Sequence, residues 1–98
     1  SFLNNLKVVS LEGEIFVNII LDLDNKLLTE PVIFCPTVTE KNELVYGLKK
    51  LISEQLIQMV SKSITDEILS DELKKIVRSY IKKSIGLKPL TYIEIVRI

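Results

Sequence analysis

The last quarter of the chain constrains the fold most, because it encodes a helix, a stop signal and a strand in direct succession. Apolar residues at helical spacing between Leu69 and Ile85 predict the helix. Gly86 stands where a left-handed residue closes a helix, and Lys88-Pro89 prevents the helix from resuming. Leu90 to Ile98 then follows as a strand. A terminal strand of this kind docks into an existing sheet, so we expect a compact α+β unit.

A β-hairpin is predicted upstream of the helices. From Glu14 to Leu23 apolar residues alternate and many are β-branched, which favours a strand over a helix. Asp24-Asn25-Lys26 is a predicted turn, after which Leu27 to Cys35 returns as a second strand. Pro31 has no N–H to donate, so this second strand should lie at an edge or carry a bulge. The face that must be buried consists of Ile15, Val17, Ile19, Leu21 and Leu23.

Two helices are predicted after Pro36. The first runs roughly from Glu40 to Lys62, with Thr37 and Thr39 as candidate N-caps. The second is expected to start at Ser70-Asp71-Glu72, a hydroxyl N-cap followed by two acids in the positive first turn.

These elements predict an α+β fold in which a three-stranded sheet, the hairpin plus the C-terminal strand, carries two helices packed on one face. The strand from Glu14 is expected in the middle, because it is the longest and is apolar on both sides. Residues 13–98 then form a single domain, and residues 1–12 are a linker remnant or a short first strand.

Composition excludes several classes of function. The 98 residues include 13 basic and 13 acidic side chains, so there is no overall field to attract nucleic acid or an anionic membrane, although a local patch could. Cys35 is alone and cannot form an intramolecular disulfide, which suits a reducing compartment, and no stretch approaches the roughly 20 apolar residues of a membrane span. We therefore expect a cytoplasmic chain with no membrane partner. Because it begins with Ser1, we favour a fragment of a longer protein.

No catalytic, metal-binding or cofactor-binding residues are predicted. Without histidine, the chain cannot form a Ser–His or Cys–His catalytic pair, and one cysteine cannot build a closed zinc site. Asp22 and Asp24 resemble the opening of a calcium loop, but the glycine and closing glutamate are missing, which favours a plain polar turn. The chain by itself is not expected to be an enzyme.

Two surfaces are candidates for binding. On the second helix, Lys74, Arg78 and Lys82 are spaced four apart and could meet RNA phosphates. No aromatic residues interleave this basic stripe, which favours an ordinary solvated face. On the sheet, Ile93 and Ile95 can point to the helices, which leaves an outward apolar set for self-association: Phe16, Ile20, Tyr92, Val96 and Ile98.

The order of the elements and the closing run from Val77 to Ile98 resemble the C-terminal domain of bacterial ribonuclease J, in the metallo-β-lactamase/β-CASP family. In that family a helix with an arginine after a valine or isoleucine leads through a Lys-Pro element to a final strand. Val77-Arg78 and Lys88-Pro89-Leu90 match this pattern, as does the Thr29-Glu30-Pro31 segment. The chain departs from many members after Pro31, where they have a longer, polar, glycine-containing connection.

The resemblance implies a non-catalytic accessory or oligomerisation domain of a metal-dependent RNA-degrading enzyme. Its partners would be further copies of itself and the catalytic core of the parent enzyme. That core, with zinc held by histidines and aspartates and with RNA as substrate, is absent from this chain. The alternative is a free-standing α+β module that binds RNA or a protein through the basic face of the second helix.

Overall fold

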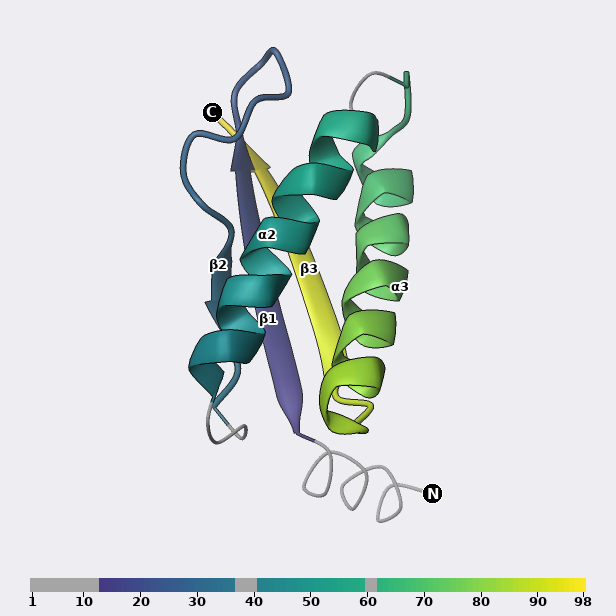
Figure 1. Cartoon of the computed structure of the whole chain (residues 1–98). Helices are drawn as coiled ribbons and strands as arrows, with labels where there is room; N and C mark the ends of the chain where they lie inside the picture. Colours follow the sequence, from purple (N-terminus) through teal and green to yellow (C-terminus); the bar gives the residue numbers. More distant parts are fainter. Residues whose placement is uncertain (1–12, 37–40, 60–61) are drawn as a thin grey trace.

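The computed structural model describes residues 13–36, 41–59 and 62–98. Two strands, two helices and a third strand follow one another: β1 (Glu14–Leu21), β2 (Val32–Phe34), α2 (Lys41–Met59), α3 (Asp66–Ile85) and β3 (Leu90–Arg97) (Figure 1). The expected α+β fold is confirmed. Residues 1–12 and the candidate caps Thr37 and Thr39 lie outside the described residues.

The three strands form one mixed sheet in the order β2-β1-β3. β1 pairs antiparallel with β2 and parallel with β3, and the parallel register runs from Glu14 opposite Leu90 to Leu21 opposite Arg97. The prediction that the first strand lies in the middle is confirmed. A parallel pair cannot be joined by a tight turn, so α2 and α3 lie in the long connection that returns the chain to β1.

The hairpin is shorter than predicted. β2 covers only three residues, and Leu27 makes an isolated bridge to Leu21 instead of opening a long return strand. The extension of the first strand to Leu23 is also wrong, because the turn begins at Asp22 and leaves Leu23 exposed. The Asp22 carboxylate accepts the backbone N–H groups of Asp24 and Lys26 at 2.8 and 2.9 Å, an Asx-type arrangement that ends the strand. The edge position expected from Pro31 is confirmed, since β2 has β1 as its one neighbour.

The core lies between one face of the sheet and the two helices. Odd-numbered residues of β1 are buried, and both helix ribbons lie on the same side of the sheet in Figure 1. A continuous cluster of buried side chains joins the layers: Ile15, Val17, Ile19 and Leu21 from β1, Leu44, Leu48, Ile52 and Leu56 from α2, and Leu69, Leu73, Val77 and Ile81 from α3.

Helix α3 starts earlier than predicted. Thr65 is its N-cap, and the Thr65 hydroxyl accepts the N–H of Ile68 at 3.2 Å. Ser70 is therefore inside the helix, where its hydroxyl donates to the Ile93 carbonyl of β3 at 3.4 Å. Thr65 and Ser70 are each a hydroxyl residue followed by two acidic residues, so either could cap the helix. The helix starts after Thr65 because the additional turn buries Leu69 in the core.

The other end of α3 is as predicted. Gly86 has a φ of 74°, in the left-handed region, and its N–H donates to the Lys82 carbonyl at 2.9 Å. Lys82 and Lys83 occupy the last turn, where cations interact favourably with the helix dipole.

Two local contacts join neighbouring elements, one between the two helices and one between α3 and β3. Gly47 of α2 faces the Tyr80 ring of α3 so closely that a Cβ at position 47 would collide with the Tyr80 hydroxyl. At the end of β3, Arg97 forms a two-pronged ion pair with Asp66 at the start of α3, with a shortest N–O distance of 2.8 Å. No described helix is both long enough and apolar enough to span a bilayer.

Candidate interaction surfaces

The sheet has an outer face, opposite the helices, that no other described element covers. Even-numbered residues of β1 and β3 point to this face, because their odd-numbered neighbours point into the core or toward the helices. The outer face is therefore open to solvent over all three strands in the described part of the chain.

Three aromatic rings form a row across the outer face. Phe16 of β1 is paired with Phe34 of β2 on one side and with Tyr92 of β3 on the other. The Phe16 and Tyr92 rings are stacked, with centroids 5.0 Å apart and planes 13° apart, and Phe34 is tilted at 38° with its centroid 6.2 Å from Phe16. The row joins two predicted residues, Phe16 and Tyr92, with Phe34, which is not among the residues predicted for this face.

The rest of the outer face alternates in polarity. In the second row, which is more polar, Asn18 lies between Val32 and Glu94. In the third row, which is apolar, Ile20 lies beside Val96. Ile98 is the most exposed of the predicted set, and its N–H donates to the Leu21 carbonyl at 3.0 Å. The structure thus brings together Phe16, Ile20, Tyr92 and Val96, with Ile98 just past the end of β3.

The basic stripe of α3 divides into two parts. Lys74 and Arg78 line a cavity of about 280 Å³ between α3 and the start of β3, whereas Lys82 does not line it. The other polar residues of the cavity are Lys88, Thr91 and Tyr92. We call this the basic cavity. Lys74 and Arg78 thus have an aromatic neighbour, Tyr92. The argument that the basic stripe lacks aromatic residues therefore does not apply to these two side chains.

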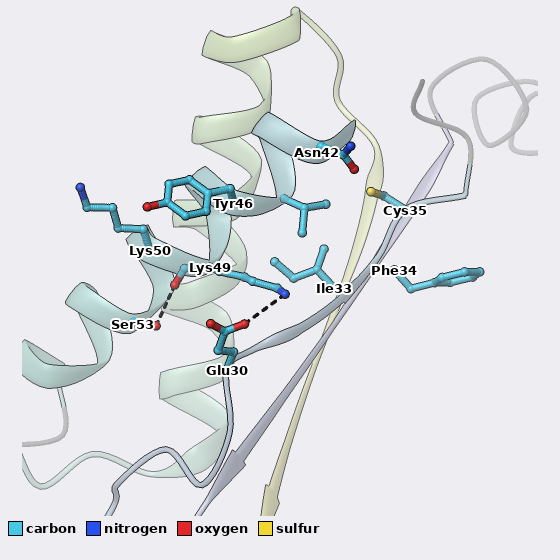
Figure 2. Close-up of a pocket in the computed structure, with 10 residues that line it drawn as sticks. Glu30, Ile33, Phe34, Cys35, Asn42, Tyr46, Lys49, Lys50 and Ser53 are labelled. Carbon is cyan, nitrogen blue, oxygen red and sulfur yellow. Dashed lines mark hydrogen bonds and ion pairs between the residues drawn. The ribbon is translucent and has the colours of Figure 1, made fainter. Parts of the chain in front are cut away.

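A larger cavity of about 530 Å³ lies between β2 and α2 (Figure 2). One wall carries Glu30, Ile33 and Cys35, and the helix contributes Tyr46 and Lys49. The Lys49 ammonium and the Glu30 carboxylate are 3.4 Å apart, so the charges that face this cavity partly neutralise each other. Figure 2 shows Phe34 pointing away from it, toward the outer face of the sheet.

The carboxylates and the cysteine of the described residues do not form a metal-binding cluster. Within residues 13–36, 41–59 and 62–98, no group of three or more His, Cys, Asp or Glu side chains could hold a metal ion. Asp22, one of the two residues that resemble the opening of a calcium loop, accepts hydrogen bonds from two backbone N–H groups of its own turn. The outer face presents apolar side chains to solvent, and the basic cavity presents positive charge.

The sequence matches no protein-family model, and no curated protein matches it significantly.

Proposed function

We propose that the chain is the non-catalytic assembly domain of a larger RNA-degrading enzyme of the ribonuclease J type, and that it pairs with a second copy through the outer face of its sheet. The observation that carries the assembly role is the aromatic row on a sheet face that no other described element covers. The parent enzyme is proposed from the resemblance around Val77-Arg78 and Lys88-Pro89-Leu90.

The exposed area of the aromatic row suits an interface. Phe16, Phe34 and Tyr92 are 36%, 59% and 47% exposed. At about 200 Å² per aromatic side chain, the three rings leave about 280 Å² of surface in water. The exposed part of Val32, which follows the aromatic row on β2, enlarges this patch, and Val96 adds apolar surface on the far side of Glu94. A patch of a few hundred Å² is as large as the largest on a typical monomer, and such patches are often functional.

Pairing two such faces is energetically feasible. Burying the three rings of both copies removes about 560 Å² from water, a gross gain of about 14 kcal/mol at 25 cal/mol per Å². Association costs on the order of 4 to 15 kcal/mol, so the rings roughly offset it and the flanking valines and Ile20 supply the net affinity. We expect a dimer that dissociates on dilution.

Sedimentation velocity over a concentration series tests the assembly role. Tyr92→Glu with Val96→Glu should convert the dimer to a monomer, because it places charges inside the apolar rows. A control is Tyr46→Glu with Ile57→Glu, which makes the same change in charge at a tyrosine and an aliphatic residue of α2 that are more exposed than Tyr92 and Val96. Lys74→Glu with Lys82→Glu should likewise leave association intact. A wild-type chain that is monomeric at high concentration, or a control that dissociates, would contradict the assignment.

The isolated chain is expected not to cleave RNA, with or without added zinc, manganese or magnesium, because the proposed role leaves catalysis to the parent's core. Incubation of a labelled RNA with the purified chain checks this. Cleavage that is abolished by a substitution within the chain would refute the non-catalytic role. Sequencing the gene upstream of Ser1 checks the parent, where we expect a histidine-rich metal-binding motif.

A further inference from the structure

We propose that the basic cavity binds the phosphate backbone of single-stranded nucleic acid, with the Tyr92 ring as a stacking surface for a neighbouring base. The cations come from α3 and the segment that follows it, outside the outer face, so their charge does not depend on the assembly role. Tyr92, however, belongs to the aromatic row, so a base can stack on its ring only in the monomer, and dimerisation through the outer face would compete with RNA for this ring.

Three cations from two segments surround the cavity. Lys74 and Arg78 are one helical turn apart on α3, and Lys88 comes from the connection between Gly86 and β3. None of the residues that line the cavity is acidic. Among the described residues no ion pair involves Lys74 or Arg78, whereas the neighbouring Lys75 is paired with Glu72 at 3.4 Å. The positive charge of Lys74 and Arg78 is therefore available to an anion.

Hydrogen bonds fix the backbone segment from Pro89 to Thr91 that lines the cavity. Pro89 is buried, and its carbonyl accepts the Thr91 hydroxyl at 3.2 Å. The N–H of Leu90 donates to the Gly13 carbonyl at 3.0 Å, which fixes the start of β3 beside β1. A site built on anchored backbone loses little freedom on binding, which favours affinity for a flexible polyanion.

Tyr92 distinguishes a nucleic acid from a simple anion. One face of its ring is stacked on Phe16, yet the residue is 47% exposed, so the exposed area comes from the rest of the ring. Stacking of a base on an aromatic ring strengthens binding and tolerates any base, because every base has a π-face. Glu94, two residues further along the same face, would repel a phosphate. The phosphate backbone of the nucleic acid should therefore lie on the α3 side of Tyr92, away from Glu94.

Fluorescence anisotropy with a fluorescein-labelled 12-nucleotide oligouridylate tests the proposal. In 50 mM NaCl, Lys74→Glu with Arg78→Glu should weaken binding at least tenfold. Lys82→Glu with Lys83→Glu is the matched control, because it makes the same change in charge on the same helix outside the cavity, and it should change binding less than threefold. With three cations engaged, the slope of log K against log salt should be about −2, and about −0.7 in the Lys74/Arg78 variant.

Further measurements separate the stacking contribution and the competing ligands. Tyr92→Leu should weaken RNA binding while Tyr92→Phe preserves it, and sedimentation of each variant reports its association state independently. Equal losses in the two charge variants, or no RNA binding at all, would overturn the proposal. Displacement of the RNA by inorganic pyrophosphate at the same phosphate concentration would reduce the site to a simple anion site. Equally tight binding of a labelled hexaglutamate peptide would assign it to an acidic protein partner instead.

Discussion

Removing the ion pair between Arg97 and Asp66 should destabilise the fold by a small, pH-dependent amount. The guanidinium Nε lies 3.0 Å from Asp66 Oδ2 and the Nη2 lies 2.8 Å from Oδ1, so both carboxylate oxygens are engaged. Arg97 Nη1 also donates to the Asp22 carbonyl at 3.4 Å. One side chain thereby connects the end of β3, the start of α3 and the turn after β1.

The magnitude follows from geometry and exposure. The Arg97 and Asp66 side chains are 31% and 46% exposed, so solvent screens much of their attraction. Exposed pairs contribute about 0.2 to 1 kcal/mol, and the two-pronged geometry places this one near the upper end. In a double-mutant cycle of Arg97→Gln and Asp66→Asn, we expect a coupling of about 1 kcal/mol at pH 7. The cycle cancels the separate loss of an acidic charge at the start of α3.

The pH dependence has a definite sign. Hydrogen bonds from Arg97 hold the pKa of Asp66 below its ordinary value of 3.8 in the folded chain. A carboxyl whose pKa is depressed by folding stabilises the fold above its unfolded pKa, and that contribution is lost as the pH falls through the folded pKa. The pKa of Arg97 is raised, so Arg97 stays charged throughout the acid range.

Urea denaturation of the wild type and three variants between pH 7 and pH 2 measures this coupling. The coupling should be full at pH 7, should fall below pH 4 and should shrink in 1 M NaCl, where an exposed pair is screened. A coupling that is zero at pH 7, or that persists undiminished at pH 2, would show that Arg97 contributes by packing and not by its charge.

Three further substitutions test the helices by the same denaturation assay. Thr65→Ala should lower the free energy of unfolding by about 1 kcal/mol through loss of the N-cap. Ser70→Ala should lower it less, because the Ser70 hydroxyl makes a single long hydrogen bond. The reverse order would contradict the observed helix start. Gly86→Val should cost on the order of 1 to 2 kcal/mol through its left-handed backbone alone, since nothing lies within 4 Å of a Cβ there, and an unchanged midpoint would refute that conformation. Gly47→Ala should destabilise despite the better helix propensity of alanine, and Tyr80→Phe should lessen the loss; a stabilising Gly47→Ala would show that the helices can separate without cost.

The predictable parts of the fold were those set by local signals. The period-2 pattern of β1 and the Gly86 stop are readable because each depends on a few adjacent residues. The start of α3 was misplaced because Thr65 and Ser70 carry the same local signal, and only the burial of Leu69 against the sheet decides between them. Local chemistry offered two equivalent answers, and tertiary packing selected one.

The candidate surfaces were predictable only within one element at a time. Alternation along β1 and β3 placed Phe16, Ile20, Tyr92 and Val96 outward without any knowledge of register. Phe34 was missed because its place in the aromatic row depends on how the short β2 aligns with β1. Lys88 was missed as a partner of Lys74 and Arg78 for the same reason, since a loop residue joins a helix face only in three dimensions.

The parallel pairing of β1 with β3 also determines when the chain can fold. The central strand finds its longest partner at the far end of the sequence, with position 14 opposite position 90. A two-stranded hairpin alone is marginal in water, and contacts between residues so distant form slowly because a long loop must close first. During synthesis, the sheet therefore cannot form around β1 and β2 until the residues up to Arg97 have left the ribosome. A truncation that removes β3 should leave an unfolded chain, not a smaller domain.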